Sequence, residues 1–183
     1  MPNGNPSPTI KENALLLKKQ LESFALPRGG YVKIMANMSH LWEELYNKGL
    51  VNSQPRILIL CTGETARGEY AGGERTALHR VDRNWNVVVM RGHGFKNQVA
   101  GGAPMTNPPP TDPEAFYDDL ETIRDGCRVL VGISEEYPVN YKGIRPLPNV
   151  GPTPAANVFL DASVIEFDTA ADIPALDGNG ATV

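Results

Sequence analysis

The side chains that could do chemistry in this sequence are two cysteines and three histidines. Cys61 follows an apolar run, and His93 lies between two glycines, whose flexibility would let its imidazole reach an exposed position. A cysteine nucleophile needs a nearby base and a group that orients the base. No spacing brings a histidine to Cys61, so a buried thiol is the simpler interpretation of Cys61. A polar loop residue is the simpler interpretation of His93.

Metal and cofactor chemistry have equally little support in the sequence. The histidines have no ligand spacing, and neither Cys61 nor Cys127 belongs to a Cys-x-x-Cys pair. The glycine-rich segment 63–75 has neither the Gly-Lys-Ser/Thr ending of a P-loop nor the glycine spacing of a dinucleotide fingerprint, and is typical of a turn or an exposed hairpin. We therefore predict no catalytic residue, no cofactor and no metal. The alternative is a small α/β enzyme that uses His93 or Cys61 near the loop 93–111.

The composition is that of one soluble globular domain. The chain has 183 residues, of which 41% are apolar, enough for a sizeable core. Its 17 basic and 21 acidic residues give a formal charge of −4, which argues against a surface that binds nucleic-acid phosphates. The N-terminal residues lack the pattern of a signal peptide, and no apolar run approaches the ~18 residues that span a bilayer. These features predict a cytoplasmic protein without a structural disulfide.

One stretch, residues 76–92, organises the expected fold. Its residues alternate with a period of two, so that apolar side chains gather on one face of an extended chain. This face carries Val81, Arg83, Trp85, Val87 and Val89. A strand of this length far exceeds the usual ~5 to 6 residues, and such a strand tends to run past its own sheet or to serve a neighbouring subunit. We expect Trp85, Val87 and Val89 to pack on a helix that begins at Pro113.

The other elements follow from capping signals and periodicity. Thr9 and Glu12 have the spacing of a capping box, at the start of a helix that ends near Pro27. The remaining expected elements are a helix at 39–48, a buried strand at 57–62, a helix at 113–127, a short hairpin near 140–144 and a long strand at 157–169. Together they predict an α+β fold, a mainly antiparallel β-sheet with helices packed on one face, long strands and extended loops. We expect a flexible arm at 1–8, a single domain at 9–170 and a flexible tail at 171–183.

This order of elements resembles that of the tail terminator proteins of long-tailed bacteriophages. In that family, an N-terminal helix is followed by a strand similar in place to 57–62, a strand pair around a turn like 64–75, and a long strand like 78–90. A helix like 113–127 and a closing strand like 158–167 complete the pattern. The resemblance covers about residues 9–170 as topology. The chain departs from plainer members in the insertion 27–54, which adds a helix, and in its long loops at 93–111 and 134–156.

The resemblance implies a virion protein of the tail or neck, assembled in the host cytoplasm and not in a membrane. It implies a homohexameric ring that caps the tail tube, ends tube polymerisation and provides the head-joining surface. The partners would be the tail tube protein and a head-completion or connector protein, with DNA passing through a central channel without sequence-specific binding. The net negative charge fits such a channel, because like charges disfavour binding.

Charged residues on the long strand and on the hairpin before it are the expected contacts between subunits or with the tail tube. These interface candidates are Arg67, Glu69, Glu74, Arg75, Arg80 and Arg83. Two alternatives stay open besides the enzyme. One is another phage neck protein, for head completion or tail completion, and the other is a non-viral adaptor domain.

Overall fold

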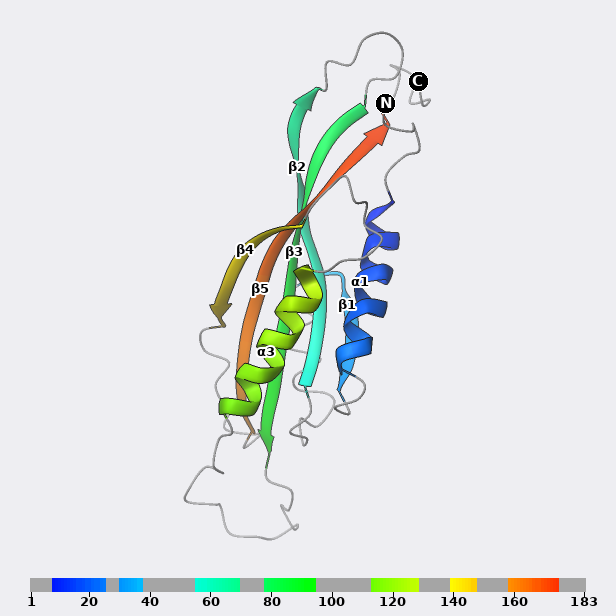
Figure 1. The fold of residues 1–183 in the computed structure, drawn as a ribbon. Coiled ribbons are helices and arrows are strands. Elements are labelled where there is room, and N and C mark those ends of the chain that lie inside the picture. The colour runs from blue at the N-terminus through cyan, green and yellow to red at the C-terminus, as the bar shows by residue number, and fades with distance from the viewer. Residues whose placement is uncertain are drawn as a thin grey trace.

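The computed structural model describes residues 8–25, 30–37, 55–69, 78–94, 113–128, 139–147 and 158–174 of the chain. These ranges contain two helices and five strands, and Figure 1 shows the strands as one elongated, twisted sheet. In chain order the elements are α1 (Ile10–Ala25), β1 (Tyr31–Met35), β2 (Pro55–Glu69), β3 (Leu78–Gly94), α3 (Pro113–Arg128), β4 (Asn140–Pro146) and β5 (Val158–Pro174).

The five strands form one mixed sheet in the order β1-β2-β3-β5-β4. β1 runs parallel to β2, and the other three neighbouring pairs are antiparallel. Both helices pack against this sheet, and they also contact each other. The fold is therefore α+β with a mainly antiparallel sheet, as the sequence predicts.

β3 is the central strand, and it confirms the long strand predicted from the alternating pattern. It spans Leu78–Gly94, two residues later than predicted at each end, and it pairs with β5 along its whole length. β2 pairs with its other side from Arg91 to His79. Because β3 has a neighbour on both sides, its backbone is hydrogen-bonded on both sides, and only its two faces remain for side-chain packing.

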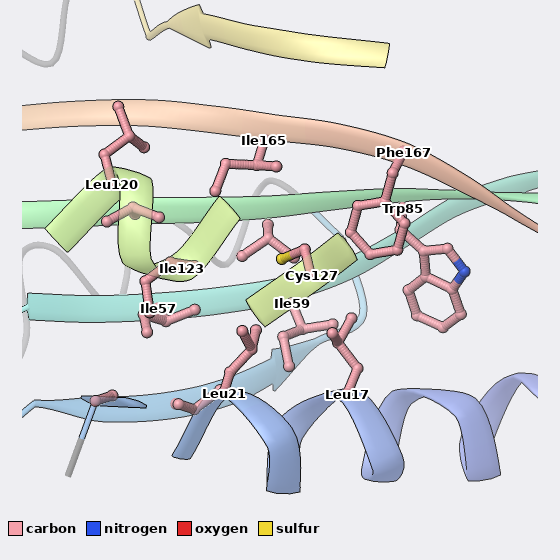
Figure 2. Close-up of a cluster of buried hydrophobic side chains, with 14 of the residues drawn as sticks. Leu17, Leu21, Ile57, Ile59, Trp85, Leu120, Ile123, Cys127, Ile165 and Phe167 are labelled. Atoms are coloured by element: carbon pink, nitrogen blue, oxygen red, sulfur yellow. The ribbon is translucent and has the colours of Figure 1, made fainter. Parts of the chain in front are cut away.

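The core lies between the sheet and the two helices. Figure 2 shows Leu17 and Leu21 of α1 pointing toward Ile59 of β2, while α3 adds an apolar stripe at helical spacing. The cluster consists of Ala14, Leu17, Leu21, Ala25, Val32, Ile57, Ile59, Trp85, Val87, Val89, Phe116, Leu120, Ile123, Cys127, Ile165 and Phe167. Trp85, Val87 and Val89 therefore share one core cluster with the apolar stripe of the helix from Pro113.

The capping box predicted at the start of α1 is present. The backbone N–H of Glu12 donates to Thr9 Oγ1 at 3.2 Å, and the backbone N–H of Thr9 donates to Glu12 Oε2 at 2.7 Å. The bond from the Thr9 backbone is the largest cause that lowers the pKa of Glu12, because it stabilises the carboxylate. These reciprocal bonds fix the first turn of α1.

Two contacts of α3 set its position. Asp119 Oδ2 accepts a hydrogen bond from Arg91 Nη1 of β3 at 2.9 Å, and the side chain of Asp119 is almost fully buried. At Gly126, a Cβ atom would lie 2.8 Å from Cε2 of Phe24 in α1. Glycine at this position therefore lets the two helices approach each other closely.

The opposite face of the sheet is apolar as well. Its buried residues are Met35, Leu58, Leu60, Val88, Met90, Ala162 and Val164. Within the described part of the chain, no helical residue belongs to this second cluster. Because β2 buries successive residues from Ile57 to Leu60, the prediction of a strand with both faces covered is confirmed.

Three features differ from the prediction. β1 falls inside the insertion 27–54 and was not expected, because five residues carry too little pattern to be recognised. The region near 140–144 is a single strand, β4, rather than a hairpin, because β5 supplies its partner. β5 continues to Pro174 with Ala171 buried, so the domain extends beyond the predicted boundary at 170.

Other predictions lie outside the described residues. They are the helix at 39–48, the arm at 1–7, the tail after 174, the loop 93–111 except residues 93–94, and the loop 134–156 except residues 139–147.

Replacing Ile123 by alanine should lower the free energy of unfolding by about 2–5 kcal/mol, because the side chain is 1% exposed and its loss leaves a cavity. Leu16→Ala is the matched control, since Leu16 is 38% exposed and the change should stay within about 0.5 kcal/mol. Urea titration followed by circular dichroism measures both variants. Equal losses in the two variants would contradict this arrangement of the core.

Candidate assembly interface

Three strands run on past the helices at one end of the sheet. We call this part the three-stranded extension, and it consists of residues 62–69 of β2, 78–84 of β3 and 168–174 of β5. Figure 1 shows β2, β3 and β5 continuing beyond both helices at this end. Seven residues of extended strand span about 23 Å. Residues 62–64 and Arg83 still lie beside the start of α1, and the two described helices leave the rest of the extension uncovered.

Polar pairs hold the three-stranded extension together. Arg80 and Asp172 face each other across β3 and β5 and form two hydrogen bonds, Nε to Oδ1 at 3.0 Å and Nη2 to Oδ2 at 3.3 Å. On the neighbouring strand, Lys142 Nζ of β4 lies 2.7 Å from Asp168 Oδ1. Cross-strand pairs of opposite charge stabilise an antiparallel sheet.

The side chain of Arg83 is buried and has its partners within this chain, although the sequence suggests an exposed charge at an interface. Its side chain is 4% exposed, and Nε donates to Glu64 Oε1 at 2.6 Å. Nη1 donates to the backbone carbonyl of Pro8, just before α1. A buried guanidinium must be paired, because its desolvation otherwise costs several kcal/mol. Arg83 therefore connects β3 to β2 and to the start of α1, and its guanidinium is bound within the subunit.

Trp85 marks the limit between the apolar core and the three-stranded extension. Its ring belongs to the helix-side cluster, and its Nε1–H donates to Thr169 Oγ1 of β5 at 2.8 Å. Both residues are buried, so this bond satisfies two polar groups that are removed from water.

An apolar groove of about 730 Å³ opens beside Trp85, on the helix side of the sheet. Its walls come from the first turns of α1, the end of β1 and the middle of β2. Ile10, Leu15 and Ile34 line it and are 40%, 49% and 37% exposed. Apolar side chains that line a concave surface and remain this exposed mark a surface suited to binding.

Cys61 lies in this groove, but neither histidine of β3 lies beside it. Burial raises the pKa of its thiol, which accordingly favours the uncharged form. Cys61 pairs with Trp85, and His93 lies eight residues further along β3, which corresponds to about 26 Å of strand. His79 lies six residues away in the other direction, about 20 Å. The register therefore separates Cys61 from both histidines of β3.

Three of the remaining candidates lie in the three-stranded extension, Arg67 and Glu69 at the end of β2 and Arg80 on β3. Glu74 and Arg75 lie outside the described residues. His93 lies near the C-terminal end of β3 rather than in a loop, because residues Gly92–Gly94 pair with Leu160–Val158 of β5. Among the described residues, no group of three His, Cys, Asp or Glu side chains is arranged to hold a metal ion.

Sequence reasoning missed the groove, although one signal pointed to it. Leu17 and Leu21 account for the buried stripe of α1, and Leu15, which lines the groove, falls off that stripe. Apolar residues outside the buried stripe of a helix indicate a second contact surface.

Comparison with protein-family models and with curated proteins gives no match to this chain. Neither helix in the described ranges is long and apolar enough to cross a membrane.

Glu64→Gln should destabilise the protein by about 1–3 kcal/mol, because it removes the charge that compensates the buried guanidinium of Arg83. Glu166→Gln is a matched control, since Arg145 Nε lies at the same 2.6 Å from Glu166 Oε1 but its side chain is 49% exposed. The control should cost less than about 1 kcal/mol. Denaturant midpoints at neutral pH measure the difference, and equal costs would show that the Arg83 pair is effectively solvated.

In dilute native protein, a thiol reagent should modify Cys61 and leave Cys127 unmodified. Cys127 is fully buried, whereas Cys61 is half-buried at the groove. The rate at Cys61 should rise with pH through the alkaline range, because its raised pKa leaves little thiolate at neutral pH. Absorbance of the released chromophore measures how many thiols per chain react, and Cys61→Ala should abolish the fast reaction. A fast reaction that persists in Cys61→Ala would contradict the burial of Cys127.

Proposed function

We propose that this chain is a structural virion protein of the tail terminator type, which forms a ring on the tail tube. The ring would end tube polymerisation and provide the surface that joins the head. The observation that carries the proposal is the three-stranded extension, whose strands continue past the helices that cover the rest of the sheet. Strands of this length are suited to reach a neighbouring subunit or a partner ring.

The order of elements supports the same proposal. The helix α1, the strands β2 and β3, the helix α3 and the closing strand β5 occur in the order of the tail terminator pattern, with β1 and β4 as additional strands. β2 and β3 are antiparallel neighbours, and β5 lies on the other side of β3. A strand pair with a long second strand is the central feature of that pattern.

The charge balance fits the proposed position around DNA. The chain carries a net charge of −4, and Arg80 and Arg83 of the three-stranded extension are paired with carboxylates. A ring of such subunits would present no surplus of positive charge to a passing duplex. DNA could then move through the channel without being held by its phosphates.

The proposed partners are further copies of this chain, the tail tube protein and a head-completion or connector protein. The protein would be located in the neck of the virion. A second neck role, head completion or tail completion, has one observation in its favour, the additional edge strand β1 inside the insertion 27–54.

The direct test combines the assembly state of the chain with its effect on tube growth. Light scattering after size exclusion should give a closed oligomer, expected to be a hexamer. The tube protein encoded in the same genome should form tubes of unlimited length alone and short capped tubes when the chain is added, with heat-denatured chain as control. A strict monomer at high concentration that leaves tube growth unchanged would contradict the proposal. Genes for a tail tube and a tape measure beside this gene would support it independently.

A further inference from the structure

The sheet has two free edges in the described part of the chain, and they differ in length and chemistry. β1 covers only Arg56 to Leu60 of β2. Beyond Leu60, no described strand lies on that side of β2, so residues 61–69 form an open edge whose residues from Thr62 to Ala66 are exposed. An open edge presents unpaired N–H and C=O groups, which is a template for another strand.

The apolar groove lies directly beside this open edge. Ile34 at the end of β1 and Cys61 at the start of the open edge both line it, and α1 forms its outer wall. Cys61 pairs with Trp85, which places the groove on the helix side of the sheet. A strand added to the open edge would hydrogen-bond through its backbone and direct alternate side chains into the groove. Such strand addition obtains affinity from the backbone and specificity from side-chain pockets.

We propose that the occupant is the β4 edge of a second copy of this chain, added antiparallel to residues 61–69 of β2 with Tyr141 directed into the groove. This inference rests on the proposed ring and names the surfaces that would form it.

The strand directions agree with this arrangement. β5 and β2 both run antiparallel to β3, and β4 runs antiparallel to β5. In a sheet that continues from one copy to the next, β4 is therefore antiparallel to the β2 that it meets. The lengths also agree, since β4 has seven residues and the open edge has nine. Pro146 has no N–H to donate, which ends the pairing segment at the residue before it.

Tyr141 also lies on the same face of the sheet as the groove. Tyr141 pairs with Phe167, and directly paired residues of antiparallel strands point to the same face. Phe167 belongs to the helix-side cluster, so Tyr141 lies on the face where the groove opens. Its ring is 36% exposed, with the guanidinium of Arg128 at 6.0 Å from its centre. An exposed tyrosine at one edge and an apolar groove at the other edge are complementary, because tyrosine is a common anchor at interfaces.

The two edges also differ in the formal charge of their own residues, of which Glu64, Lys142 and Arg145 have ion-pair partners within the chain. β4 carries one lysine, one arginine and no acidic residue, whereas residues 61–69 of β2 carry two glutamates and one arginine. The contact joins two different surfaces, so each copy uses its groove for one neighbour and its β4 edge for the other. A head-to-tail contact of this kind generates a closed ring when its rotation closes.

Polar substitutions in the two surfaces test the inference, with light scattering as readout. Leu15→Asp, in the groove, and Tyr141→Ser, on β4, should each weaken association about 100-fold or more, because each removes an anchor of the contact. Leu16→Asp is the matched control, since Leu16 is similarly exposed on α1 but does not line the groove, and it should form the wild-type ring. Melting curves check that the variants fold.

Mixing the two defective variants gives a sharper result. Leu15→Asp retains an intact β4 edge and Tyr141→Ser retains an intact groove, so an equimolar mixture should form a 1:1 dimer and no larger species.

Independently, the reaction of Cys61 with a thiol reagent should slow about tenfold in the wild-type ring relative to dilute monomer, since a filled groove excludes the reagent. This second measurement needs no substitution.

The outcomes separate this inference from the proposed function. If Leu15→Asp folds and still forms a ring, or if Cys61 reacts equally fast in ring and monomer, the groove is not the contact, and the proposed ring stands without it. If the wild-type chain stays monomeric at high concentration and does not limit tube growth, the proposed function fails and the inference fails with it.

Discussion

Helices and strands rise by different distances per residue, and this difference determines where the protein can have an apolar core. A 16-residue helix such as α1 or α3 is about 24 Å long, whereas the 17 residues of β3 or β5 span about 56 Å. Two helices that contact each other on one face therefore leave much of the sheet uncovered. The strand residues beside the helices are apolar, and the residues beyond them are dominated by polar pairs.

The transition between these two regions occurs within a few residues of β3. Val87 is packed in the core, Trp85 combines core packing with a hydrogen bond to Thr169, and Arg83 is a buried cation. All three lie on the same face, because they alternate along the strand. The partners of Arg83 come from β2 and from the residue before Thr9, so the ion pair also determines where α1 begins relative to the sheet.

The features that the sequence predicts are those whose signal is local. The alternation along β3 and the spacing of Thr9 and Glu12 each lie within one element, and both predictions are confirmed. β1 has only five residues, and its stability as a strand depends on pairing with residues 25 positions away, which no local pattern reveals. The burial of Arg83 was missed for a similar reason, since Glu64 and Pro8 are its neighbours only after folding. The groove requires α1, β1 and β2 together, and only the apolar residues off the buried stripe of α1 hinted at it.

The same contacts that position α1 also shape the groove before any partner arrives. The capping box of Thr9 and Glu12 fixes the first turn of α1, which carries Ile10 on the groove wall. The bond from Arg83 to the Pro8 carbonyl holds this turn against the sheet. Binding to a surface that is already ordered avoids the entropic cost of ordering side chains and backbone on association. A groove fixed by buried contacts can therefore accept a strand with modest apolar area, and a change in those buried contacts would weaken association without touching the partner.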